Sequence, residues 1–307
     1  MWGWAMLYMG SVNRLIFWVL IPLTLIFYVT FRAFEWQSWD DGGRQLIAEQ
    51  HAINLSNRDD VDCLILGGSN GVFSLSAEQI SNESNLTCYN LSLANEGYSD
   101  DAYFNFIRNL PIERTEIKSV IYSSVYPLAS QPFILRLEHN QNQTSIRGEI
   151  GFQLVGRSLA SYMKNVLQGK PLFQYVQYPA PTSSGDFNFD EYDGCTSEEL
   201  RDHWTPVTLD EDFKQWLGNN LMTVRNLFPN ANISFVLPSK LGRNMGEGAF
   251  ATFSDSLQSE VVMQSANYIE QSPFSDVSVL CDATHHGNSI GRTIRTSELL
   301  MLLDIDE

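Results

Sequence analysis

The feature that most constrains the fold is a repeated alternation of short apolar runs with longer helical patterns, which begins near residue 61. Five runs have the length and composition of buried strands: VDCLILGG, LTCYNLSLA, KSVIYSSVYPL, ISFVLPS and VSVLCDATHH. The segments expected to be helical are SLSAEQI, with Ser76 and Gln79 as a capping box, DDAYFNFIRNL, DEDFKQWLGNNLMTVRNLF, residues 252–270 and GRTIRTSELLMLL. Strands that alternate with helices imply a mainly parallel sheet with helices on both faces.

The first apolar run ends abruptly in Gly67-Gly68-Ser69-Asn70-Gly71. In an open parallel sheet, ligands bind in the crevice beyond the carboxyl ends of the strands, so this turn is expected to present Ser69 there. We expect the first two glycines to let the chain turn sharply and Gly71 to leave room near the hydroxyl. A serine hydroxyl becomes a nucleophile when a neighbouring base takes its proton.

A candidate base follows the last predicted strand, in CDATHHGNSIG. Asp282 and His285 are three residues apart, and on a tight loop the carboxylate can orient one imidazole nitrogen while the other faces a serine. The neighbouring His286 is a weaker candidate for the same role. Because the predicted fifth strand ends at the same edge of the sheet as the first, we expect His285 to reach Ser69.

Gly-x-Ser after the first strand, together with Asp-x-x-His before the last helix, resembles the SGNH (GDSL-like) hydrolase and acyltransferase superfamily over about residues 60–303. The resemblance implies a three-layer α/β/α flavodoxin-like fold in which Ser69 is the nucleophile, His285 the general base and Asp282 the orienting acid. It also implies an oxyanion hole made by the backbone N–H groups of Ser69 and of Gly97, which lies in NLSLANEGYS.

The chain departs from the family in the third block, where an asparagine usually completes the oxyanion hole. This sequence has YSSVYPL there, and the candidate replacements are Asn70, Asn95, Ser123, Ser124 and Tyr126. Membrane-anchored branches of the superfamily often vary in this block. They include the periplasmic proteins that O-acetylate alginate and cellulose and the teichoic-acid D-alanyl transfer protein, which this chain resembles most.

An N-terminal membrane anchor is indicated by the seventeen uncharged residues LIFWVLIPLTLIFYVTF between Arg14 and Arg32. With its flanks, such a helix can roughly cross a hydrocarbon core of about 30 Å. A cleaved signal peptide is the alternative, but RAFEWQSW after Phe31 offers no small-x-small cleavage site. We expect one uncleaved helix in the inner or plasma membrane, with the body in the periplasm or another extracytoplasmic space.

The expected organisation is an anchor at 1–36, a connecting segment at 37–60 and a catalytic domain at 61–307. Residues 129–205 break the strand–helix alternation, and we interpret them as an insertion that forms a cap beside the crevice or a tolerated surface excursion. Its aromatic residues either line a glycan groove or pack the insertion itself: Phe173, Tyr175, Tyr178, Phe187 and Phe189.

Charge and cysteine spacing exclude several classes of function. The formal net charge is −17, from 19 basic and 36 acidic residues, which disfavours nucleic-acid binding. The four cysteines form no C-x-x-C pair, so no zinc site is expected, nor any cofactor, since phosphate-loop and dinucleotide fingerprints are missing. Cys63 and Cys88 are expected to be buried as small hydrophobes, and Cys195 and Cys281 are candidates for a disulfide.

These observations favour a membrane-anchored serine acyltransferase that moves an acyl group, commonly acetyl, to a polysaccharide or other glycan. The resemblance implies a polytopic membrane acyltransferase as partner and the lipid bilayer as support. Two alternatives remain open from the sequence. One is an esterase that deacetylates a glycan, and the other is a degenerate SGNH domain that binds glycans or scaffolds a complex.

Overall fold

The computed structural model describes residues 47–48, 50–93, 100–124, 179–192, 195, 211–237, 247–272, 274, 276–281 and 286–303, all within one compact unit. No helix among these residues is long and apolar enough to span a membrane. The predicted anchor, residues 1–36, lies outside them, as does most of the predicted insertion.

The described residues form a parallel sheet of five strands in the order β2-β1-β3-β4-β5. The strands are β1 (Cys63–Gly67), β2 (Cys88–Asn90), β3 (Ser119–Ser123), β4 (Asn232–Val236) and β5 (Asn267–Ile269). This is the strand order of flavodoxin-like doubly wound sheets, in which the chain reverses direction across the sheet between β1 and β3. The predicted parallel α/β fold is therefore confirmed, and its switch point lies beside the end of β1.

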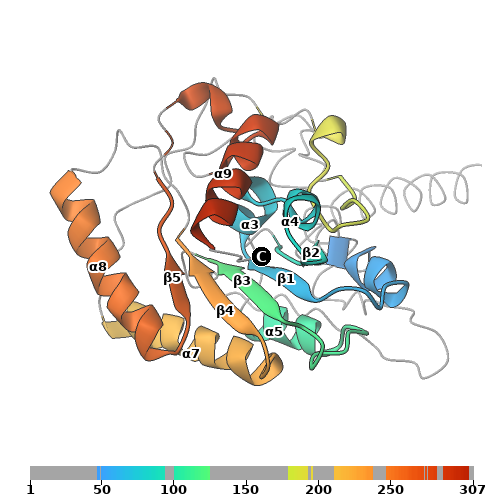
Figure 1. The fold of residues 1–307 in the computed structure, drawn as a ribbon, viewed down its shortest axis with the longest axis horizontal. Helices are drawn as coiled ribbons and strands as arrows, with labels where there is room; N and C mark the ends of the chain where they lie inside the picture. Colours follow the sequence, from blue (N-terminus) through green and yellow to red (C-terminus); the bar gives the residue numbers. More distant parts are fainter. Residues whose placement is uncertain are drawn as a thin grey trace, which may run out of the picture. The chain divides into compact units, whose positions relative to one another are not determined.

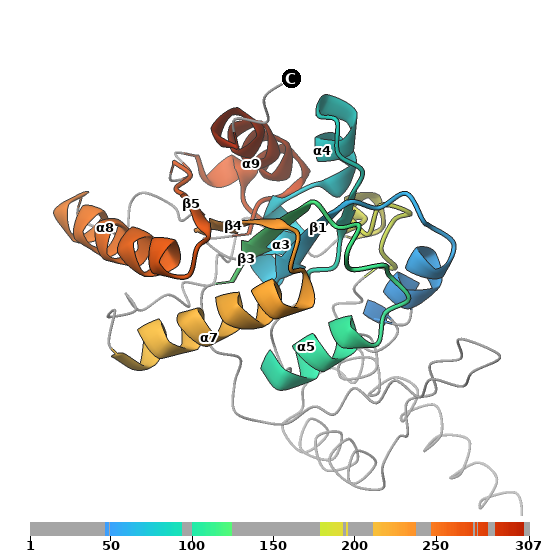
Figure 2. The ribbon, with the colours of Figure 1, turned by 60° about the horizontal axis from the view of Figure 1, so that its bottom comes forward.

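Helices cover both faces of the sheet, as Figure 2 shows in a view close to the plane of the strands. On one face lie α3 (Ser69–Ser74), α4 (Ala77–Glu83) and α9 (Ser289–Leu302), which bury residues such as Ile65 and Leu299. On the other lie α5 (Asp100–Arg108), α7 (Glu211–Leu227), α8 (Glu247–Met263) and the helical residues 50–56, around a larger core that includes Leu64 and Phe235. Two separate apolar cores on the two faces of one sheet are the physical basis of the three layers.

Alternation of side chains along each strand explains why both faces are apolar. In β1, Cys63 and Ile65 enter one core while Leu64 and Leu66 enter the other, and all four are fully buried. A strand buried on both faces must be apolar at every position, which is why VDCLILGG is a continuous run.

The helix predicted from the Ser76–Gln79 capping box is present, although only half of the box forms. The hydroxyl of Ser76 accepts a hydrogen bond from the backbone N–H of Gln79, with an N–O distance of 3.1 Å. The backbone N–H of Ser76 instead donates to the hydroxyl of Thr296 on α9, at 3.0 Å. The cap thus joins α4 to α9 instead of closing on itself.

The prediction of the fifth strand is wrong. β5 is the short segment Asn267–Ile269, which lies within the range expected to be helical, because α8 ends at Met263. The apolar run predicted as a strand instead forms a 3-10 helix, η5 (Val277–Val279), and packs on Phe274 in a small cluster of its own. A short apolar run alone does not distinguish a strand from a turn that buries its side chains elsewhere.

Cys63 and Cys88 are buried, as expected, but they are not separate small hydrophobes, since the two form a disulfide. They are direct partners in the register of β1 and β2, with a Cα–Cα distance of 4.2 Å. A second disulfide joins Cys195 to Cys281, as the sequence allowed. All four cysteines of the chain are therefore paired.

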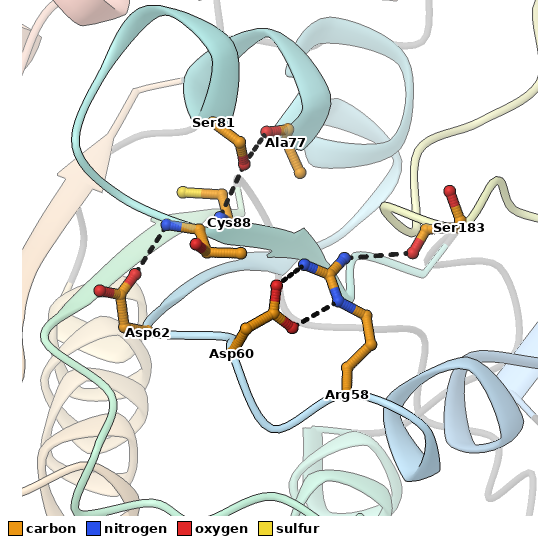
Figure 3. A network of polar contacts seen from close by, with 8 residues as sticks. Arg58, Asp60, Asp62, Ala77, Ser81, Cys88 and Ser183 are labelled. Carbon is orange, nitrogen blue, oxygen red and sulfur yellow. Dashed lines mark hydrogen bonds and ion pairs between the residues drawn. The ribbon is translucent and has the colours of Figure 1, made fainter.

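The amino ends of the strands are held by a dense polar network (Figure 3). One carboxylate oxygen of Asp62 accepts the backbone N–H of Thr87 at 2.8 Å, and the other pairs with the Lys118 ammonium at 2.8 Å. The hydroxyl of Ser81 accepts the N–H of Cys88 at 2.8 Å. These bonds fix the starts of β1, β2 and β3 to one another.

Arg58 ties the segment before β1 to the end of the predicted insertion. Its guanidinium makes a two-bond ion pair with Asp60, at 2.9 and 2.8 Å, and donates to the carbonyl of Ser183 at 3.4 Å. Ser183 belongs to the described part of the predicted insertion, residues 179–192, so the end of that insertion returns to the body of the domain (Figure 3).

Candidate active site

The turn that follows β1 can be made only with glycine at position 67. Gly67 has φ of +137°, a conformation that side-chain-bearing residues rarely adopt. A Cβ atom at this position would lie 1.9 Å from the backbone oxygen of Ser123 in β3. The first glycine of the Gly-Gly-Ser sequence therefore permits a sharp turn pressed against the neighbouring strand.

Hydrogen bonds fix this turn to the strands on both sides. On the β3 side, Gly68 N–H donates to the Ser123 carbonyl at 3.2 Å. On the β2 side, the Gly67 carbonyl accepts the N–H of Leu93 at 3.0 Å, and Gly67 N–H donates to the hydroxyl of Tyr103 at 2.9 Å. The residue that follows the turn is Ser69, which consequently starts from a backbone held in one conformation.

Ser69 is the first residue of α3, at the carboxyl end of β1, and it is half-buried. The first N–H groups of any helix have no acceptor within the helix, so the N–H of Ser69 is suited to bind a negative oxygen. This placement agrees with the position predicted for the nucleophile. The start of α3 lies beside the switch point of the sheet, where ligands bind in folds of this order (Figure 1).

Helix α3 packs directly on the residues that follow the predicted Asp-x-x-His pair. One helical turn after Ser69, the ring of Phe73 stacks on the ring of His286, with 4.5 Å between the ring centres and an angle of 18°. The backbone N–H of Gly287 donates to the hydroxyl of Ser74 at 3.3 Å. The helix that begins with Ser69 therefore touches residues 286 and 287, which directly follow the predicted Asp-x-x-His pair in the sequence.

The residues on either side of 282–285 are joined to each other. Cys281 N–H donates to the carbonyl of His286 at 2.8 Å, and Leu280 forms an antiparallel bridge with Gly287. Asn288 N–H donates to the Val279 carbonyl at 2.9 Å. Both flanks of the segment that carries Asp282 and His285 are thereby held at one place beside α3.

An aromatic cluster supports this contact from behind. Phe73, fully buried, touches the rings of Phe187, Phe189 and Tyr192, and the disulfide partners Cys195 and Cys281 complete the cluster. Phe187 is 5% exposed, so it packs the end of the insertion against α3, one of the two roles expected for these aromatics. Of the other aromatics considered, Phe189 is half-buried, and Phe173, Tyr175 and Tyr178 lie outside the described residues.

The remaining predicted site residues divide into two groups. Asn70 and Ser124 are described and buried, and Ser124 directly follows Ser123 at the end of β3, next to the Gly67 turn. The predictions for Gly97, Asn95, Tyr126, Asp282 and His285 fall outside the described residues, so they stay predictions. Ser123 serves the turn through its backbone oxygen.

The role expected for Gly71 needs correction. A Cβ at Gly71 would lie 2.0 Å from the hydroxyl oxygen of Ser92, so this glycine makes room for Ser92 rather than for the Ser69 hydroxyl. Within the described part of the chain, the side-chain oxygens of Asn70 and Ser92 are buried without a hydrogen-bond partner. Buried unpaired oxygens are uncommon in folded proteins and concentrate where strain or function requires them.

Sequence reasoning missed three residues that build the site's surroundings. Tyr103 bonds the Gly67 turn. Asn90 donates to the carbonyls of Gly71 and Leu75, at 3.0 and 3.2 Å, and so holds α3 from below. Asp186 accepts the N–H groups of two residues in the first turn of α4, at 2.7 and 2.9 Å. A polar residue at a strand end, as Asn90 is, was the one available signal.

One buried titratable group away from this site, His51, has a structural partner. His51 is fully buried, lies 3.0 Å from the hydroxyl of Tyr89, and burial lowers its pKa to about 3. It is therefore neutral in the folded protein at physiological pH. No cluster of metal-binding side chains occurs among the described residues.

No protein-family model and no curated protein matches the sequence. Solved structures with a similar arrangement include a family two carbohydrate esterase from Clostridium thermocellum, at 8% identity, 80% of this chain, 63% of that chain and a TM-score of 0.40. They also include the periplasmic domain of a lipopolysaccharide acetyltransferase from Salmonella ser. Paratyphi A, at 10% identity, 81% and 87% coverage and a TM-score of 0.37. A protein from Parabacteroides merdae described as a GDSL-like lipase matches at 10% identity, 81% and 98% coverage and a TM-score of 0.38.

These structures are described as a carbohydrate esterase, an acetyltransferase domain and a GDSL-like lipase. The chain spans less than two thirds of the length of the Clostridium esterase. The TM-scores of these matches are only 0.37 to 0.40. The chemistry proposed below is therefore argued from the strand order and contacts of this chain.

Proposed function

We propose that this protein is a membrane-anchored serine O-acyltransferase that passes an acyl group, commonly acetyl, to a hydroxyl of an extracytoplasmic polysaccharide. The observation that carries the proposal is the packing of α3 on residues 286 and 287. It brings the helix that begins with Ser69 against the flank of Asp282 and His285. A nucleophile and a base contributed by distant parts of the chain must meet in this way to act together.

In the proposed reaction, the Ser69 hydroxyl oxygen attacks the acyl carbon of a donor while His285 takes its proton. The leaving group departs with that proton, and an acyl-serine remains. A sugar hydroxyl then attacks the acyl-serine, His285 takes the sugar proton and returns it to Ser69, and the acylated sugar is released. The N–H groups of Ser69 and Gly97 would hold the negative oxygen, a role whose loss typically costs about 10²–10³ in rate.

The disulfides support the proposed compartment. Both join residues of the folded domain, and disulfides persist chiefly in oxidising surroundings such as the periplasm or the cell exterior. We propose an extracytoplasmic body, held at the membrane by residues 15–31. A polytopic membrane acyltransferase that delivers the acyl group across the bilayer is the partner we propose.

Covalent labelling tests the nucleophile. The wild-type protein should react with a fluorophosphonate at Ser69, as located by peptide mass spectrometry, and Ser69→Ala should lose the label. Ser259→Ala is the matched control, because Ser259 is an exposed serine on α8 that only bonds the Asp255 carbonyl. Undiminished labelling of Ser69→Ala would remove Ser69 from the role of nucleophile.

The identity of the product distinguishes acyl transfer from hydrolysis. Ser69 and His285 would act in the same way with a sugar or with water as acceptor, so these residues alone do not separate the two reactions. Purified protein is mixed with an activated acetyl ester and candidate oligosaccharides, and the products are identified by mass spectrometry. Acetylated sugar supports the transferase, whereas free acetate alone supports an esterase. Failure to form an acyl-enzyme with any ester donor would favour a degenerate domain that binds glycans or scaffolds a complex.

A further inference from the structure

A buried tyrosine hydroxyl lies between β1 and β2 at the carboxyl end of their pairing, immediately before the Ser69 turn. Tyr103 lies in the first turn of α5 and is 5% exposed. Its hydroxyl accepts the N–H of Gly67 at 2.9 Å and donates to the carbonyl of Leu91 at 3.2 Å. One side chain thus bonds two strands at the point where both leave the sheet.

The register shows that this hydroxyl replaces a direct bond between the strands. β1 and β2 pair with a constant offset of 25 residues, as in Ile65 opposite Asn90. The N–H of Leu91 donates to Ile65 at 2.8 Å and that of Leu93 to Gly67 at 3.0 Å. In a regular parallel ladder the N–H of Gly67 would then donate to the carbonyl of Leu91. Instead, the Tyr103 oxygen stands between these two groups.

The inserted group is a neutral phenol. Burial raises the pKa of Tyr103 well above its ordinary value of 10.0, against a smaller lowering effect of the Gly67 N–H. The hydroxyl therefore keeps its proton at physiological pH, and it acts as acceptor for Gly67 and donor to Leu91 at the same time.

We infer that Tyr103 is a positioning residue that holds the Ser69 turn at a set spacing from the end of β2 at Leu91. This inference rests on the proposed function, in which the backbone N–H of Ser69 is an oxyanion donor. Gly67 precedes Ser69 by two residues, so a shift of Gly67 also moves that N–H. Oxyanion donors work only within about 2.7–3.1 Å of the developing charge. A change in strand spacing by the size of one hydroxyl group would therefore move a donor out of this range.

The test is Tyr103→Phe, measured with an activated acetyl ester and a fluorophosphonate. Without the hydroxyl, the two strands either close onto a direct bond or leave Gly67 N–H unpaired, and both shift the turn. Because a misplacement of about 1 Å costs about 10²-fold, we expect kcat and the labelling rate to fall about ten- to a hundredfold. KM should change less than about twofold, and the pH midpoint of the rate should stay in place because the base is untouched.

Tyr89→Phe is the matched control. It removes a fully buried tyrosine hydroxyl from the middle of β2, where the bonded partner is His51, so its labelling rate should stay within about twofold of wild type. As rescue, 4-aminophenylalanine at position 103 restores a donor for Leu91 and a weaker acceptor for Gly67. Its rate should lie between those of wild type and Tyr103→Phe, and it also serves if the phenylalanine variant does not fold.

The outcomes separate this inference from the proposed function. Equal rates per folded molecule in wild type and in the variants at position 103 would overturn the positioning role while leaving Ser69 as nucleophile. A wild-type protein that is not acylated at Ser69 would remove both.

Discussion

The two ends of the sheet are built in opposite ways. At the amino ends of β1, β2 and β3, both carboxylate oxygens of Asp62 are bonded, one to a backbone N–H and one to a lysine. The hydroxyl of Ser81 likewise accepts a backbone N–H. At the carboxyl ends the chain contains a glycine at φ +137°, a hydroxyl inserted into the ladder, and buried oxygens of Asn70 and Ser92 without partners in the described residues.

Under the proposed function, the amino ends of β1, β2 and β3 hold the fold together and their carboxyl ends do the chemistry. Strained backbone and unpaired polar atoms reduce stability, so they persist where a site requires them. Changes at the carboxyl end should therefore cost activity and stability together, whereas changes at the amino end should cost stability alone.

The largest effect is expected from Gly67→Ala. The new methyl group would meet the Ser123 carbonyl at 1.9 Å in a backbone conformation that alanine avoids. We expect a loss of about 3–5 kcal/mol in the free energy of unfolding and no detectable acylation of Ser69. Denaturant unfolding and fluorophosphonate labelling measure the two.

Gly218→Ala on α7 is the control for this substitution. There a Cβ would meet only the ends of two flexible side chains, Gln264 at 3.2 Å and Glu260 at 3.6 Å. Alanine in a helix interior is favoured over glycine by about 0.5–1 kcal/mol, so the variant should be as stable as wild type or slightly more so, with full labelling. A Gly67→Ala protein that behaved like Gly218→Ala would show that the turn is not constrained by β3.

The next effect concerns the contact between Gly71 and Ser92. Gly71→Ala would place a methyl group 2.0 Å from the Ser92 oxygen and should cost about 1–3 kcal/mol. Adding Ser92→Gly removes the obstructing side chain, so the double variant should regain much of this loss, with a coupling energy of about 0.5–3 kcal/mol. If the changes in unfolding free energy of the two single variants simply add in the double variant, as measured by urea unfolding, then the two residues are not in contact.

Whether the sequence predicts a feature at the carboxyl end of the sheet depends on how far apart in the chain the interacting residues lie. The turn at Ser69 could be predicted because an apolar run that stops at Gly-Gly-Ser is a local signal. Tyr103 could not, because it reads as one apolar residue of a helix beside Phe104 and Phe106, and its bond to Gly67 spans 36 residues.

Elements with weak local signals were likewise misplaced. β5 has only three residues, Asn267–Ile269, and its identity comes from pairing with β4. The Cys63–Cys88 disulfide depends on the register of two strands, which spacing along the chain does not give. Asp186 lies in a polar stretch typical of a loop, yet it caps a helix that begins 109 residues earlier.

A buried histidine allows effects of pH on folding to be separated from effects on catalysis. The pKa of His51 is about 3 in the folded protein, against 6.5 ordinarily, because burial disfavours its charged form. Between these values only the unfolded chain binds the proton. Its contribution to stability is thus complete above pH 6.5 and is lost as pH falls towards 3, by up to about 1.4 kcal/mol per pH unit.

His51→Asn should therefore flatten the dependence of unfolding free energy on pH between 6.5 and 5, where wild type loses about 2 kcal/mol through this group. Tyr89→Phe, which keeps the histidine buried, should retain the wild-type slope, since desolvation and not the hydrogen bond lowers the pKa. An unchanged slope in His51→Asn would assign the acid sensitivity to other groups. The pH dependence of Ser69 acylation should be the same in all three proteins.

The smallest effect tests the amino end directly. Asp62→Ala leaves the N–H of Thr87 without its acceptor and removes a surface ion pair whose lysine is 70% exposed. Because exposed ion pairs contribute little, most of the expected loss of about 1–2 kcal/mol comes from the backbone N–H. Lys118→Ala, which breaks only the ion pair, should change stability far less. Both variants should label at Ser69 at the wild-type rate. A slower rate in Asp62→Ala would mean that the amino end also sets the geometry of the Ser69 turn, and the division between the two ends of the sheet would not hold.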